Sequence, residues 1–159
     1  MTFARYMFYP DLSHECQVDR GPYVRAIGWL SHEHSFSTGL VSLEFLHALR
    51  RHTCAPWQPI IAAGAHRCEF CPPRSDGRFV GGSSNVWIPA EGVVYVAPVL
   101  VLHYIEAHGY CPPESFIRAV LDCPEQGTTA YRERMRRFPA WWVEYLDVGL
   151  PLGERKPSP

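Results

Sequence analysis

The alternation of apolar and polar positions predicts a few short strands in the first two thirds of the chain. Residues 24–30 form an apolar run between Gly-Pro and a serine, which is typical of a strand. Residues 85–88 and 93–96 are two further apolar runs separated by Pro-Ala-Glu-Gly, so they predict a hairpin. Residues 60–63 predict one more short, buried strand.

Four segments repeat their apolar residues at the three-to-four-residue spacing of a helix. Ser42 is a suitable N-cap for the first of them. The second is an apolar, buried helix, expected to begin at Pro98 and to end just before Gly109. The third begins at Pro113, and Thr128 caps the fourth. Together these elements predict an α+β fold with a small antiparallel sheet or hairpin and three to four helices.

Cysteines and histidines at two points of this pattern match the ligand types that zinc prefers. Cys68 and Cys71 form a Cys-x-x-Cys turn, and His103 and His108 lie on the expected apolar helix. Zinc takes thiolate and imidazole donors in a tetrahedron. These four residues are therefore the predicted ligands of a structural Zn²⁺, with the strands and helices around it. His66 lies on the same side of an extended segment as Cys68, so it is an alternative fourth ligand in place of His108.

The surroundings of the motif separate it from two better-known patterns. The segment between the cysteines and the histidines has 31 residues, 72–102, whereas a nucleic-acid-binding finger has about 12–15. A redox Cys-x-x-Cys should open a helix, but here two prolines follow it at once. A redox pair and a pair of buried thiols stay as the other interpretations of the cysteines.

Composition narrows the class of protein. With 159 residues, of which 47% are hydrophobic, we expect residues 1–149 to form one zinc-containing domain and residues 150–159 a disordered tail. A net charge of -1 disfavours a nucleic-acid or membrane-surface partner. No apolar run reaches the roughly 18 residues of a membrane span, and no secretory segment is recognisable. We therefore expect a cytoplasmic protein whose six cysteines are thiols or metal ligands.

Several short motifs are spread over residues 9–123. Among them are Gly-x-His-x-Cys-x-x-Cys at 64–71, Asn-x-x-Ile-Pro at 85–89, Tyr-Val-Ala-Pro at 95–98 and His-Tyr-Ile-x-x-His-Gly-Tyr at 103–110. In these motifs the chain resembles a family of small, functionally uncharacterised bacterial proteins. The resemblance implies that the histidine and cysteine cluster belongs to the domain itself, and it implies no catalytic residue.

Three functions are compatible with this pattern. Four protein ligands would close the zinc, which favours a non-catalytic module that binds another protein, for example a regulatory, defence-linked or immunity-type partner. A zinc hydrolase would instead need an open metal position and a carboxylate base, for which Glu69 and Glu106 are the nearby candidates. A nucleic-acid-binding zinc protein would use the arginines at 132–137, although the net charge disfavours it. For the first function, Trp141, Trp142 and those arginines mark the expected contact surface, with burial of the tryptophans in the core as the alternative.

Overall fold

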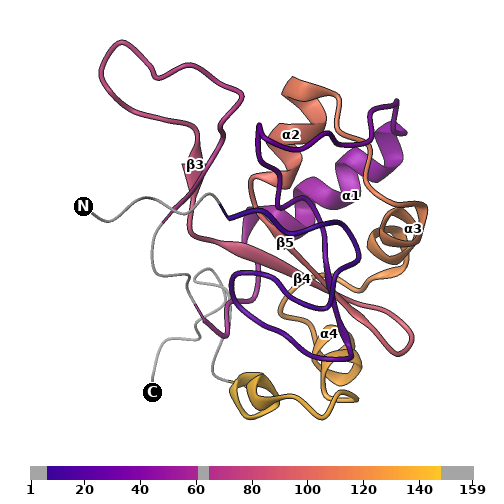
Figure 1. Cartoon of the computed structure of the whole chain (residues 1–159). Helices are drawn as coiled ribbons and strands as arrows, with labels where there is room; N and C mark the ends of the chain where they lie inside the picture. The colour runs from indigo at the N-terminus through magenta and orange to yellow at the C-terminus, as the bar shows by residue number, and fades with distance from the viewer. Residues whose placement is uncertain (1–6, 61–64, 148–159) are drawn as a thin grey trace, which may run out of the picture.

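A three-stranded sheet forms the centre of the computed structural model, which describes residues 7–60 and 65–147 (Figure 1). Strand β5 (Val94–Pro98) lies in the middle, with β4 (Asn85–Pro89) antiparallel on one side, and this pair confirms the predicted hairpin. On its other side β5 pairs in parallel with β1 (Val24–Ala26). The sheet is therefore mixed, and the expectation of a purely antiparallel sheet was wrong. A parallel pair needs a long crossover connection, for which no local sequence signal exists.

Within the described residues, four α-helices and a 3₁₀ helix surround the sheet, so the α+β class and the expected number of helices are confirmed. Their bounds are α1 (Leu43–Cys54), α2 (Val101–His108), α3 (Glu114–Asp122), α4 (Thr129–Met135) and a 3₁₀ helix at Trp141–Tyr145. The side chains of Ser42 and Thr128 accept hydrogen bonds from backbone N–H groups three residues later. The two predicted N-caps are thus confirmed.

The period-2 alternation of β4 and β5 sorts their side chains between two cores. Val86 and Ile88 point to a cluster that also holds residues of α1, α2 and α3, such as Phe45 and Phe116. Trp87, between them, points to the opposite cluster, and the residues of α4 and the 3₁₀ helix in that second cluster are Tyr131, Met135 and Trp142. In Figure 1 the first three helices accordingly lie on one side of the sheet and α4 on the other. Both faces of this small sheet are covered.

Helix α2 begins three residues later than expected. Pro98 is the last residue of β5, opposite Asn85, and the helix starts at Val101. The apolar run continues without a polar break from the buried strand into the buried helix, so periodicity alone does not separate them. Gly109 does follow the helix in the left-handed conformation (φ 69°), as predicted.

A separate two-stranded ribbon carries the Cys-x-x-Cys turn. Its strands are β2 (His66–Arg67) and β3 (Gly81–Gly82), which pair antiparallel, and the chain between them extends away from the sheet (Figure 1). The strand predicted at 60–63 lies, apart from Ile60, outside the described residues, as does the predicted tail at 150–159. Within the described residues, no helix has the length and apolar character that a membrane crossing requires.

Candidate metal centre

The ribbon fixes the position of Cys68. The Cys68 N–H donates to the carbonyl oxygen of Val80 at 2.8 Å, which continues the β2–β3 pairing by one residue. At Gly81 a Cβ atom would lie 2.3 Å from the carbonyl oxygen of His66, so only glycine allows the two strands to approach this closely. The side chain of Cys68 is buried and that of Cys71, one turn later, is half-buried.

Helix α2 supplies the two histidines, His103 in its body and His108 as its last residue. The helix ends there because the N–H groups of Gly109 and Tyr110 both turn back to the carbonyl oxygen of Tyr104. The rings of His103 and His108 lie edge to face with their centroids 5.0 Å apart. Both rings thus face the same point beside the last turn of the helix.

The four side chains converge on one point between the ribbon and α2. His103 Nε2 lies 3.3 Å from Cys71 Sγ, and His108 Nε2 lies 3.4 Å from the Sγ atoms of both Cys68 and Cys71. All four donor atoms lie within 4.8 Å of one another. In a tetrahedral site with zinc–sulfur bonds of 2.3 Å and zinc–nitrogen bonds of 2.0–2.1 Å, sulfur and nitrogen are about 3.6 Å apart. The residues therefore fit a single metal ion, with two thiolates and two imidazoles as its donors.

His66, the alternative ligand, lies outside this group. Its buried ring hydrogen-bonds through Nε2 to the Tyr104 hydroxyl at 3.0 Å and packs edge-on against Trp29. Tyr104 is itself fully buried beneath the metal centre. His66 therefore connects the ribbon to the core behind the four donors.

Burial favours the neutral forms of two candidate ligands, Cys68 and His103. It raises the pKa of the Cys68 thiol above its usual value of 9.0. It also lowers the pKa of His103 below 6.5, and the neighbouring His108 acts in the same direction. A metal that binds here therefore displaces the thiol proton of Cys68 and meets the imidazole of His103 in its neutral form.

Each of the two carboxylates considered as general bases contacts a side chain of another element. Glu106 pairs with Arg50 on the surface. Glu69 is almost fully buried and contacts His32, as well as the hydroxyl of Ser31 at 3.4 Å. Glu69 and His32 line a cavity of about 230 Å³ next to the two cysteines. His32 and Glu69 are 37 positions apart in the sequence, and only the tertiary structure brings them together.

Phe70, between the two cysteines, is a second contributor that sequence reasoning missed. Its ring packs edge-on against Phe36 (5.3 Å between centroids) and Tyr104 (5.9 Å), and it lies beside His108. This side chain anchors the Cys-x-x-Cys turn on α2. The only sequence feature that could have indicated this role is that Phe70 is an apolar residue between the two cysteines.

The predicted contact surface is only partly exposed. Trp142 is fully buried, with its indole N–H donating to Asp19 at 3.1 Å, so for this residue the core alternative is correct and it is not part of an exposed surface. Trp141 is 43% exposed and donates to the other carboxylate oxygen of Asp19. Three of the nearby arginines form ion pairs with aspartates; they are Arg132, Arg134 and Arg136.

A comparison with protein families gives one match. A family model described as a domain of unknown function (DUF7919) matches residues 7–121, which is more than half of the chain. The match contains the sheet, the ribbon and all four candidate ligands, and it ends within α3. This agrees with the expected resemblance to a functionally uncharacterised family. No curated protein and no solved structure matches the chain.

Proposed function

Because the chain belongs to the family described as a domain of unknown function (DUF7919), we propose its function from its own residues. It is a zinc-stabilised, non-catalytic module that binds another protein in a regulatory role, and bacterial defence or immunity systems are one setting for such a role. The proposal includes the cytoplasm as its compartment, because none of the six cysteines, all of which lie in the described residues, forms a disulfide.

The observation that carries the proposal is the convergence of four protein donors. Two cysteine and two histidine side chains are a donor set that selects zinc over harder ions such as Mg²⁺ or Ca²⁺. A tetrahedral zinc with four protein ligands has no position for water, so it neither generates hydroxide nor polarises a substrate carbonyl. Its contribution is to folding, because it joins the β2–β3 ribbon to α2.

The zinc hydrolase is the second candidate, and one observation favours it. The cavity next to Cys68 and Cys71 contains the carboxylate of Glu69 with its partner His32. For catalysis one of the four donors would have to leave the metal and a water would have to take its place. The cavity makes this alternative specific enough to test.

Metal analysis and cobalt substitution distinguish the two functions. The purified chain should hold about one zinc, and Cys68→Ser should lose it, whereas Cys54→Ser, an exposed thiol outside the cluster, should keep it. In the cobalt-substituted protein, added azide should leave the visible spectrum unchanged, because a closed site has no exchangeable ligand. A spectrum that shifts on saturation with azide would establish an open position and favour the hydrolase.

Protein binding is tested separately, by identifying a partner and rebuilding the complex. The metal-loaded chain is used for affinity capture from its source cells, and each captured protein is purified and mixed with it alone. A stoichiometric binary complex supports the proposal. If the chain forms no complex with any captured protein, the binding function is wrong even though the zinc site stands.

A further inference from the structure

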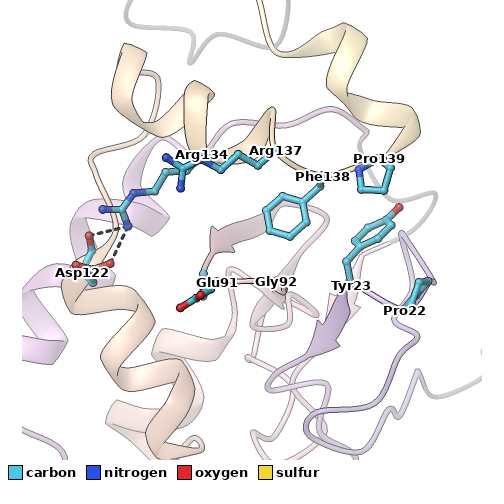
Figure 2. A pocket seen from close by; sticks show the side chains of 10 residues that line it. Pro22, Tyr23, Glu91, Gly92, Asp122, Arg134, Arg137, Phe138 and Pro139 are labelled. Atoms are coloured by element: carbon cyan, nitrogen blue, oxygen red, sulfur yellow. Dashed lines mark hydrogen bonds and ion pairs between the residues drawn. The ribbon is translucent and has the colours of Figure 1, made fainter.

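A groove at the opposite end of the molecule from α2 is lined by both charged and aromatic side chains. It lies between the turn of the β4–β5 hairpin, the start of β1 and the chain that leaves α4, and its volume is about 740 Å³ (Figure 2). Figure 1 shows α4 and α2 well separated. The groove shares no residue with the metal centre. A substitution in the groove can therefore be tested without altering a candidate metal ligand.

The charges of the groove are unevenly neutralised. Arg134 donates to the carboxylate of Asp122 at 2.7 Å and to its carbonyl oxygen at 3.2 Å. The guanidinium of Arg137, beside it in Figure 2, has no hydrogen-bond or ion-pair partner among the described residues. Glu91, on the hairpin turn, also lines the groove, so two arginines and two acidic residues balance to no net charge.

Aromatic side chains form the other wall. The rings of Tyr23 and Phe138 lie with their centroids 6.0 Å apart, and Phe138 points into the space between α4 and the hairpin turn (Figure 2). Two prolines, Pro22 and Pro139, extend this wall. The groove thus offers a planar, unpaired guanidinium next to an apolar surface.

We propose that this groove binds a peptide segment of the partner protein that presents a single carboxylate next to an apolar or aromatic side chain. An arginine fork binds a carboxylate through two parallel hydrogen bonds. The carboxylate would pair with Arg137, and the neighbouring apolar side chain would pack on Tyr23 and Phe138. The inference rests on the proposed protein-binding function and assigns its contact site.

The acidic residues of the groove exclude polyanions. Glu91 and Asp122 would repel a phosphate group, which carries nearly two negative charges, or a nucleic-acid backbone more strongly than one carboxylate. The net charge of the whole chain, -1, provides no compensating attraction. Of the anions that a partner can present, the monoanionic carboxylate is the one that this arrangement favours.

One wall of the groove lies beyond the region that the family model matches. Asp122, Arg134, Arg137 and Phe138 all follow residue 121, where the match ends. The metal centre, by contrast, belongs to the matched region.

The test uses short peptides and the zinc-loaded chain. The probe is the N-acetylated, C-amidated tetrapeptide Gly-Asp-Phe-Gly, followed by amide shifts in ¹H–¹⁵N spectra. Its controls replace the aspartate by asparagine, the phenylalanine by glycine, or the aspartate by phosphoserine. We expect saturable shifts at Tyr23, Gly92 and Arg137, with an affinity on the order of millimolar for so small a ligand. All three control peptides should bind more weakly.

Two charge-matched variants locate the binding site. Arg137→Gln should weaken binding of the aspartate peptide about tenfold, because a charge-assisted hydrogen-bonded pair is lost. Arg118→Gln removes another exposed positive charge, on α3 and outside the groove, and should leave binding unchanged. The proposal would be overturned by any of three results. These are equal affinity of the two variants for the aspartate peptide, amide shifts confined to another surface, or tighter binding of the phosphoserine peptide than of the aspartate peptide.

Zinc content measured on the same samples keeps the two proposals apart. If the chain holds zinc but gives no saturable peptide shifts, the groove assignment is wrong, and the protein-binding function is still judged by the reconstituted complex. If the chain holds no zinc, the zinc-stabilised module itself is wrong, whatever the peptides do.

Discussion

Replacing Gly81 by alanine should weaken metal binding although Gly81 is not a ligand. A Cβ atom at this position would lie 2.3 Å from the carbonyl oxygen of His66 and 3.1 Å from the Cα atom of Arg67. Both of these atoms belong to the backbone of β2, so no side chain can rotate away to make room. The adjacent Gly82 is the matched control, because a Cβ there would meet no heavy atom within 4 Å.

The size of the effect follows from the displacement. The shortest ordinary contact between carbon and a carbonyl oxygen is about 3.3 Å, so β2 and β3 must separate by about 1 Å. Such overpacking costs about 1–3 kcal/mol. The separation also strains the 2.8 Å hydrogen bond from the Cys68 N–H to Val80, which holds Cys68 in place. Loss of a contact that positions a metal ligand typically lowers metal affinity about 10–100-fold, and we expect an effect in this range for Gly81→Ala.

Competition with a chromophoric chelator at constant pH measures the zinc dissociation constant of each variant. Gly82→Ala should match the wild type in affinity, with a stability change of no more than about 1 kcal/mol. Thermal unfolding of the zinc-loaded proteins shows whether Gly81→Ala has lost its fold or only its affinity. Equal zinc affinities for the two alanine variants would refute the argument that the close approach of β2 and β3 positions Cys68.

Five further substitutions test the site and the core. His108→Ala should lower zinc affinity by more than roughly 100-fold, the upper range for loss of a contact that only supports a ligand. His66→Ala should keep the zinc and lower thermal stability. Chelator competition measures the affinities, and melting curves measure the stabilities. Trp142→Ala should lower the free energy of unfolding by about 3–5 kcal/mol in urea, and Trp141→Ala, which is 43% exposed, by clearly less. Burial lowers the pKa of His52 below 6.5, so the unfolded chain takes up its proton first as the pH falls. The free energy of unfolding should then decrease below pH 6.5, and His52→Gln should reduce this slope by up to about 1.4 kcal/mol per pH unit in urea titrations at several pH values.

Elements that depend on local interactions could be predicted from the sequence. The caps at Ser42 and Thr128 involve an N–H group only three residues away, and the left-handed residue after α2 is a glycine. The hairpin of β4 and β5 closes across a short turn with Gly92 at positive φ. In each case the signal and the structure that it specifies lie within a few residues of each other.

Features that depend on distant contacts could not be predicted. The parallel pairing of β1 with β5 joins positions about 70 residues apart, and β1 has only three residues. Adjacent residues 141 and 142 have the same side chain, and only the body of the protein decides that Trp142 is buried and Trp141 is not. The contact of His32 with Glu69 likewise depends on two loops that meet only in the folded chain.

The candidate site could be predicted in part. The residue types indicated a metal site, but the sequence did not decide which histidine is the fourth ligand. His66 and His108 are both compatible with the spacing to Cys68. The structure separates them by one contact, the hydrogen bond from the His66 ring to the Tyr104 hydroxyl behind the cluster. That contact joins residues 38 positions apart, so no local pattern announces it.

The geometry of the four donors favours a metal over a cluster of hydrogen-bonded thiols. Hydrogen bonds alone would explain a sulfur paired with a nitrogen, but His108 Nε2 lies 3.4 Å from two sulfurs at once. Hydrogen bonds would pair Cys68 with His108 and Cys71 with His103, which leaves the second close contact, between His108 and Cys71, unexplained because a neutral imidazole offers one acceptor. A shared cation removes this difficulty, because it replaces the thiol protons and requires donors of both kinds at nearly equal separations. Three of the four sulfur–nitrogen separations are 3.3–3.4 Å, and all four donor atoms lie within 4.8 Å of one another, which is why we interpret the cluster as a metal site rather than as part of the core.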